Sequence, residues 1–215
     1  MRLMVWFTLL AAVPAMCQVD SPRRQIEEMA AGMVCLAGIP DGLISLAWLS
    51  SDDFFHRGDY ERAYSVLRLI TRLEPSDPEA WSSAAWLLIN GIAPRHTGRR
   101  REELTAAGSV LLQEGIALTP GRWELLFDMG WELLRQGEAE RALSYLDTAV
   151  KLDPPLKVYR LRAEALMKTG RYRDAVDAFR QMREAFPQYR GVADRFIRQL
   201  TDGSGTDTRT DGATP

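Results

Sequence analysis

One spacing, repeated three times, constrains the fold of this chain more than any other feature of its sequence. Each copy begins with a glycine, and an alanine, two apolar residues and a proline follow it after five, nine, twelve and seventeen residues. A glycine suits a tight turn, an alanine suits a close crossing of two helices, and the two apolar residues share one helical face. The proline ends the second helix because it cannot continue the backbone hydrogen bonding. The spacing therefore predicts a series of helical hairpins, with copies at Gly58, Ala63, Leu67, Ile70 and Pro75; at Gly137, Ala142, Leu146, Ala149 and Pro154; and at Gly170, Ala175, Phe179, Met182 and Pro187.

The first helix of each hairpin carries a second pattern, upstream of the glycine. A residue near its start is followed, four residues later, by a small residue where the helices cross: Ala47 and Ser51, Trp81 and Ala85, Leu126 and Gly130, and Tyr159 and Ala163. Together with the turn segments Gly58 to Ala63 and Gly170 to Ala175, these positions resemble the tetratricopeptide-repeat (TPR) family, whose period is about 34 residues. The segment from Leu125 to Ala142 is also similar to exported bacterial proteins of this family. The resemblance implies an all-α fold, an α-solenoid of about four TPR hairpins with N- and C-terminal capping helices.

The repeat spacing divides the chain into segments. We expect a signal peptide at 1–17, an N-terminal capping helix at 18–43, a repeat array at 44–189, a C-terminal capping helix at 190–200 and a disordered tail at 201–215. The expected units of the array are 44–77, 78–122, 123–155 and 156–189. The second unit exceeds the usual period by about eleven residues, and we place this insertion near 91–101, between its two helices, because glycine, proline and charged residues cluster there. Gly108 and Gly115 stand where alanine is usual, which predicts a weaker second helix in this unit.

The N-terminal residues have the layout of a secretory signal peptide. Met1 and Arg2 provide a positive start, and the apolar run from Leu3 to Val13 is shorter than the ~20 residues that a membrane-spanning helix needs. The pattern predicts export to the periplasm or beyond, with cleavage after Ala15 or Cys17, and no later segment could span a membrane. Met16 is too large for the position before an acylated cysteine, which argues against lipid anchoring at Cys17. Cys35 is either a small buried hydrophobe or, where both cysteines remain, a partner for a disulfide with Cys17.

Composition and spacing also restrict the chemistry. The 27 basic and 29 acidic residues give a net charge of −2, which argues against nucleic acid as a partner. The histidines His56 and His96 form no metal-ligand spacing, and no phosphate-binding loop or nucleophile motif occurs in the sequence. Asp52 and Asp53 are adjacent on a predicted helix, so they point about 100° apart and cannot share one proton-transfer site. We therefore expect no catalytic residue, no metal and no cofactor.

The first helices of the hairpins are expected to line a concave groove that binds a partner protein or peptide. On their outward faces we predict a candidate groove made of Trp48, Asp52, Phe55, Trp86, Ile89, Phe127, Trp131, Leu134, Arg160 and Glu164. Tryptophan and other aromatic residues are enriched among the residues that dominate interface energies. Two interpretations stay open: the groove is free to receive an apolar or extended peptide, or the N-terminal helix or tighter packing fills it.

The insertion in the second unit carries a basic cluster. Arg95, Arg99, Arg100 and Arg101 are candidate contacts for an anion, and a solvated loop diluted by Glu102 and Glu103 is the alternative. The function predicted from the whole sequence is a non-catalytic interaction scaffold or assembly factor of a bacterial cell envelope that binds another protein or a peptide segment. An accessory subunit of an envelope enzyme complex, and a binder of anionic surfaces or nucleic acid through the arginines, are the alternatives.

Overall fold

The computed structural model describes residues 42–204 of the chain. They belong to two compact units, which divide between Leu73 and Glu74, and each unit is described by itself. Every regular element among these residues is helical, so the predicted all-α fold is confirmed. The predicted signal peptide, nearly all of the predicted N-terminal capping segment, and residues 205–215 of the predicted tail lie outside the described residues.

The first unit is described as one helical hairpin. Helix α2 (Gly42–His56) and helix α3 (Tyr60–Leu73) are joined by a turn at Gly58, whose φ is +75°. The amide of Gly58 donates to the carbonyl of Phe55 and the amide of Asp59 donates to the carbonyl of Phe54, both at 2.9 Å. This is the Schellman closure of a helix end, and it needs a residue that accepts a left-handed backbone.

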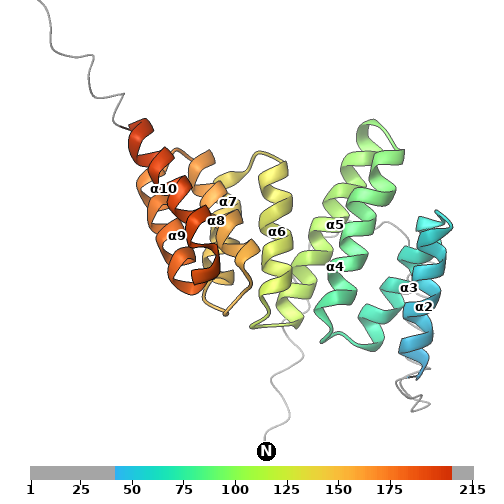
Figure 1. The fold of residues 1–215 in the computed structure, drawn as a ribbon. Helices are drawn as coiled ribbons and strands as arrows, with labels where there is room; N and C mark the ends of the chain where they lie inside the picture. Colours follow the sequence, from blue (N-terminus) through green and yellow to red (C-terminus); the bar gives the residue numbers. More distant parts are fainter. Residues whose placement is uncertain (1–41, 205–215) are drawn as a thin grey trace, which may run out of the picture. The chain divides into compact units, whose positions relative to one another are not determined.

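The second unit contains three more hairpins and a last helix. Figure 1 shows the pairs α6/α7 and α8/α9 side by side, in yellow to orange, with α10 in red packed against α9. The elements are α4 (Pro78–Trp86), the π-helix η1 (Leu87–Ile92), the 3₁₀-helix η2 (Ala93–Arg95), α5 (Gly98–Leu118), α6 (Trp123–Arg135), α7 (Ala139–Ala149), α8 (Leu156–Lys168), α9 (Tyr172–Ala185), the 3₁₀-helix η3 (Pro187–Tyr189) and α10 (Arg190–Ser204). The stacked hairpins form an α-solenoid, as the spacing predicted.

The residues of the threefold spacing occupy the core. The alanines and the two apolar residues of all three copies are buried, and Ala63, Ala142 and Ala175 have no exposed surface. Gly137 and Gly170 repeat the turn of the first unit, with φ near +83° and +74°. The crossing at Gly130 is tighter still, because a Cβ added there would lie 2.7 Å from Cγ of Leu146. The sequence pattern therefore marks the contacts that hold each hairpin together.

The second hairpin differs from the prediction, since its insertion is helical. Helix α4 continues without a break through η1 and η2, and two residues separate the end of η2 from the start of α5. The added turns form a core of their own from apolar residues on both helices: Leu87, Leu88, Ile92, Ala93 and Leu104 are all buried. Because these residues can pair across the hairpin, the insertion lengthens both helices, and the turn itself shrinks to His96 and Thr97. Helix α5 has 21 residues and continues through Gly108 and Gly115.

Helix α10 covers the end of the array. The ring of Phe196 stacks on Phe179 of α9, with centroids 4.8 Å apart and planes 4° from parallel. Arg183 Nη1 lies 2.9 Å from Asp194 Oδ1. The helix runs to Ser204, four residues into the predicted tail, because Thr201 Oγ1 bonds back to the carbonyl of Ile197 at 2.9 Å and so joins the helix.

Candidate binding groove

A groove of about 340 Å³ lies in the second unit, where helices α6 and α8 face α10. Its walls carry apolar side chains from α6, α8, α9 and α10 and charged side chains from α8. The lining residues are Phe127, Trp131, Lys157, Arg160, Leu161, Glu164, Met167, Phe179 and Phe196. Four of them, Phe127, Trp131, Arg160 and Glu164, were predicted from the sequence.

Helical periodicity explains why these four side chains meet. On α6, Phe127 and Trp131 are one turn apart, on the side away from the buried Met129 and Leu133. On α8, Arg160 and Glu164 are also one turn apart, and both are exposed. The core therefore needs one side of each helix and leaves the other side to line the groove.

The aromatic floor is partly exposed. Trp131 keeps 49% of its surface in contact with solvent, although it is one of the largest apolar side chains in the unit. Phe196 and Met167 are half-buried at the same groove. Packing within α6, α8 and α10 thus leaves this apolar surface incompletely covered.

A lysine stands at one edge of the groove. Lys157 Nζ lies 4.6 Å from the ring centroid of Phe127 and 4.9 Å from that of Trp123. An ammonium over two aromatic faces is attracted by their quadrupoles, which holds it near the rings. The position of this cation is therefore set by the same aromatic residues that line the groove.

A partly buried carboxylate lies beside this edge, between α4 and α6. Ser82 Oγ donates a hydrogen bond of 2.5 Å to Asp128 Oδ2. Burial raises the pKa of the Asp128 carboxyl and the charge of Glu124 adds to the rise, while the Ser82 hydrogen bond and the charge of Lys157 offset it only in part. Its place between two helices, with a hydroxyl partner, makes Asp128 a link between neighbouring repeats.

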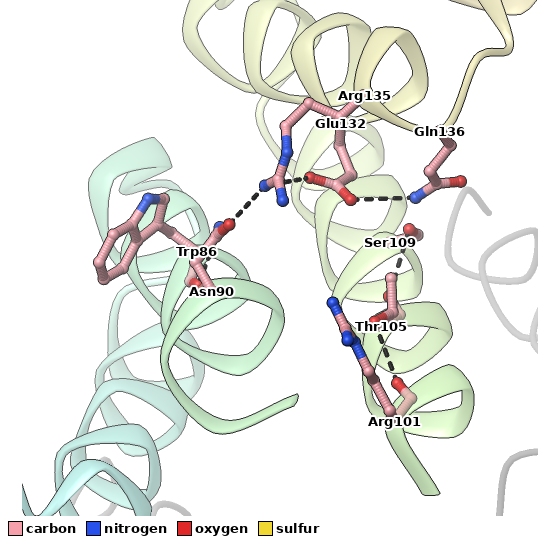
Figure 2. Close-up of polar contacts among 8 residues, drawn as sticks. All are labelled: Trp86, Asn90, Arg101, Thr105, Ser109, Glu132, Arg135 and Gln136. Carbon is pink, nitrogen blue, oxygen red and sulfur yellow. Dashed lines mark hydrogen bonds and ion pairs between the residues drawn. The ribbon is translucent and has the colours of Figure 1, made fainter. Parts of the chain in front are cut away.

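A second polar link joins η1, which continues α4, to the C-terminal end of α6 (Figure 2). Arg135 Nη1 donates to Asn90 Oδ1 across the repeats and also approaches Glu132 Oε2 at 3.3 Å. Glu132 is only 5% exposed, and its other oxygen accepts from Gln136 Nε2 at 3.0 Å. The two links place the C-terminal end of the α4–η1 helix beside the last turn of α6.

Three of the predicted groove residues in this unit do not line the groove. Ile89 and Leu134 are 6% and 7% exposed and belong to the core, so their assignment to a binding face was wrong. Trp86 is 52% exposed, and Figure 2 shows its indole pointing away from the Arg135 cluster. The groove on α6, α8 and α10 does not include it.

The other three predicted residues belong to the first unit. Asp52 and Phe55 are exposed on α2, and Trp48 is half-buried. The ring of Phe55 stacks on Tyr60 of α3 at 5.4 Å, and Asp52 Oδ1 lies 3.4 Å from His56 Nδ1. Both of these contacts lie within the α2–α3 hairpin.

The predicted anion contacts lie at the tip of the second hairpin. Arg95 ends η2, and Arg99, Arg100 and Arg101 form the first turn of α5. Arg99 Nε lies 2.8 Å from Glu103 Oε1, and Arg100 Nη1 lies 3.8 Å from Glu103 Oε2. The four arginines are thus exposed, and Glu103 on the same helix offsets part of their positive charge.

Five groove residues escaped the sequence-based assignment: Lys157, Leu161, Met167, Phe179 and Phe196. Lys157 lies three residues before Arg160 on the same helical side, so the periodicity of α8 could have identified it. Phe196 had no such signal, because its place depends on how α10 packs against α9. Within residues 42–204, no group of three or more metal-ligating side chains is placed to hold an ion. In the same range, no helix combines the length and the apolar character needed to cross a membrane.

The comparisons with known proteins agree with this architecture. Residues 127–190 match the family model described as tetratricopeptide repeat, a segment that begins within α6 and ends where α10 begins. No curated protein sequence matches the chain. A solved structure of a substituted variant of MamA aligns with a TM-score of 0.53 at 17% identity, covering 77% of this chain and 90% of that chain. MamA from Desulfovibrio magneticus RS-1 aligns with a TM-score of 0.52 at 18% identity, covering 79% of this chain and 97% of that chain. Residues 127–190 are thus similar to tetratricopeptide repeats, and the two solved structures share the fold of the chain.

Proposed function

We propose that this protein is a non-catalytic interaction scaffold that binds a polypeptide segment of a partner protein in the groove between α6, α8 and α10. The observation that carries the proposal is the half-exposed indole of Trp131 on a floor of further apolar side chains. An aromatic side chain buries 150–250 Å² when it is fully covered, so covering the exposed half of Trp131 would contribute about 2–3 kcal/mol at ~25 cal/mol/Å². Such a residue has the properties of an interface hot spot.

The test selects binding peptides and then asks whether they need the groove. A display library of random peptides about 16 residues long is panned on the full chain, and the affinities of the recovered peptides are measured by fluorescence anisotropy. Because Trp131 is half-exposed, Trp131→Ala leaves the core intact, and we expect it to weaken these peptides by about tenfold or more.

Trp86→Ala is the matched control, since Trp86 is equally exposed but lies outside the groove. We expect affinities within about twofold of the unaltered chain for this variant. Peptides that bind the Trp131→Ala chain as tightly as the unaltered chain would refute binding in this groove.

We further propose that the protein is exported to a bacterial cell envelope. The support is the N-terminal sequence, where a basic start, an apolar run from Leu3 to Val13 and small residues follow one another. Export predicts a mature chain that begins at Met16 or Gln18 in the periplasmic or secreted fraction, and N-terminal sequencing of the fractionated protein would show it. Recovery of the intact chain from the cytoplasm alone would refute the proposal.

A further inference from the structure

We propose that the groove recognises an acidic, apolar peptide segment, in which a carboxylate side chain binds Arg160 while a neighbouring apolar side chain covers Trp131. The inference rests on the proposed function, because it names the partner chemistry of the same groove. Both residues line one groove, so a single short segment can reach them together.

Arg160 has no carboxylate partner among the residues that the structure describes. Four other arginines of the C-terminal helices have carboxylate partners in the described part of the chain, and Arg173, which lies outside the groove, has none there: the pairs are Arg162 with Asp147, Arg171 with Asp174, Arg180 with Asp177, and Arg183 with Asp194. Arg160 is exposed at the groove, and residues 42–204 supply it with no ion pair or hydrogen bond. A guanidinium presents five donors in a planar fork that matches the two oxygens of a carboxylate. Arg160 can therefore form a bidentate pair of hydrogen bonds with such a group.

Lys157 adds a second positive charge to the groove beside Arg160. It lies three residues before Arg160 on α8, and the rings of Phe127 and Trp123 hold its ammonium near the groove edge. The acidic groups that act on Lys157 have partners of their own: Glu124 pairs with Arg122 at 2.9 Å, and Asp128 accepts from Ser82. The ammonium therefore remains available to a ligand that enters over the aromatic rings.

Glu164 is the carboxylate among the residues that line the groove. Glu164 lies one turn after Arg160 and 3.7 Å from Lys168 Nζ, so its charge is balanced from its own helix. The lining thus has two cations and one compensated anion, with aromatic and aliphatic side chains between them. A segment that places Asp or Glu next to Leu, Met or Phe complements both properties, whereas a basic segment would meet like charge at Arg160 and Lys157.

The experiment compares two display libraries of equal peptide length and equal apolar content. One library has Asp and Glu at its polar positions, and the other has Lys and Arg. Both are panned on the full chain, and the recovered peptides are then measured against single variants by fluorescence anisotropy. We expect the acidic library to be enriched and the basic library to give no peptide whose binding depends on Trp131.

Arg160→Gln should weaken the acidic peptides by about three- to tenfold, since it removes the charge but keeps a hydrogen-bonding side chain. Arg173→Gln is the matched control, because Arg173 is an exposed arginine of α9 that does not line the groove, and it should change affinity less than twofold. Arg160→Glu should reverse the preference, so that Lys-substituted versions of the same peptides bind more tightly than the acidic ones. Raising the salt concentration from about 50 mM to about 300 mM should reduce the difference between Arg160 and Gln at this position.

Enrichment of the basic library, or equal affinity of the acidic peptides for the unaltered chain and for Arg160→Gln, would overturn the acidic preference. If Trp131→Ala still weakens the peptides in that case, the groove keeps its proposed function and the charge inference alone fails. If neither library yields binding that depends on Trp131, both proposals fail. A dimer in sedimentation that Trp131→Ala dissociates would then identify a second copy of the chain as the occupant.

Discussion

Gly108→Ala gives a direct test of how closely the second hairpin is packed. In an exposed helix this change stabilises a protein by up to about 1 kcal/mol, because alanine loses less conformational entropy than glycine. At Gly108 the new Cβ would lie 2.3 Å from Cγ1 and 2.7 Å from Cδ1 of Ile89, and 3.3 Å from the carbonyl oxygen of Ala85. Both neighbours are buried, so neither can move into solvent.

Forcing a methyl group into a packed core costs about 1–3 kcal/mol. The cost at Gly108 belongs at the upper part of this range, because the contact involves a side-chain atom close to the backbone and a second atom of the same isoleucine. After the gain in helix propensity is subtracted, we expect Gly108→Ala to lower the free energy of unfolding by about 1–2 kcal/mol.

Gly191→Ala in α10 is the matched control, since nothing lies within 4 Å of the Cβ it would add. It should raise the free energy of unfolding by about 0.5–1 kcal/mol. A double-mutant cycle then assigns the penalty to one contact. Ile89→Ala removes both clashing atoms and should cost about 2–4 kcal/mol alone, but the pair with Gly108→Ala should cost about 2–3 kcal/mol less than the sum of the single changes.

Urea denaturation followed by helical circular dichroism gives these differences, provided that the variants share one m-value. A Gly108→Ala chain as stable as the Gly191→Ala chain would refute the close crossing of α5 and η1. Strict additivity of the two changes would show that the penalty arises somewhere other than Ile89.

Three further predictions concern the links between elements. Asp128→Asn should stabilise the protein at neutral pH, because burial raises the pKa of this carboxyl in the folded state. The unaltered chain therefore loses stability as the pH rises from the ordinary carboxyl pKa through the raised one. Urea titrations at several pH values should show the difference between the two chains growing over that window. Arg135→Ala should lower the free energy of unfolding by about 0.5–1.5 kcal/mol, and in a chain with Asn90→Ala it should cost less, because both changes remove the same hydrogen bond. Phe196→Ala should release α10 at a cost of about 2–3 kcal/mol, seen as faster hydrogen exchange in α10 and unchanged exchange in α6; equal acceleration in both would contradict a local role for the stack on Phe179.

The sequence was sufficient to predict the hairpins, because their contacts repeat at fixed spacing. Ala63, Ala142 and Ala175 each meet a neighbouring helix at the same offset from a turn glycine, so one physical constraint appears three times. The same regularity located Phe127, Trp131, Arg160 and Glu164 on one side of α6 and α8, because both helices keep the 3.6-residue period from end to end. Period alone thus identified four of the nine residues that line the groove.

The second hairpin could not be predicted in the same way, because the glycines of its second helix allow two interpretations. Gly108 and Gly115 lower helix propensity, which predicts a weak helix, but they also permit the close approach of a second helix. A Cβ at Gly115 would lie 2.8 Å from Cβ of Trp81, so here the close approach prevails. Which interpretation is correct depends on whether a helix packs against the glycines. Only the folded hairpin shows that residues 87–92 form such a helix.

The two errors at the groove concern Ile89 on η1 and Leu134 on α6. The π-helix that begins at Leu87 has a wider turn than an α-helix, so the side chains after Trp86 no longer follow the period from which Ile89 was assigned to the groove. The longer helix also reaches the last turn of α6, as the link from Asn90 to Arg135 shows, and Leu134 in that turn is buried. Ile89 and Leu134 are thus core residues, although a regular repeat would leave both on the groove side.

This displacement bears on where a partner can bind. Because Ile89 and Leu134 are committed to the core, the apolar surface that remains beside α6 is the part around Phe127 and Trp131, next to α8 and α10. The cations of α8 adjoin that part, so the apolar and the charged contacts of a ligand are concentrated on the C-terminal repeats. A shortened second hairpin should consequently leave the peptides selected above bound with unchanged affinity, provided that α6 keeps its fold, whereas loss of the Phe179–Phe196 stack should weaken them by opening the wall that α10 supplies.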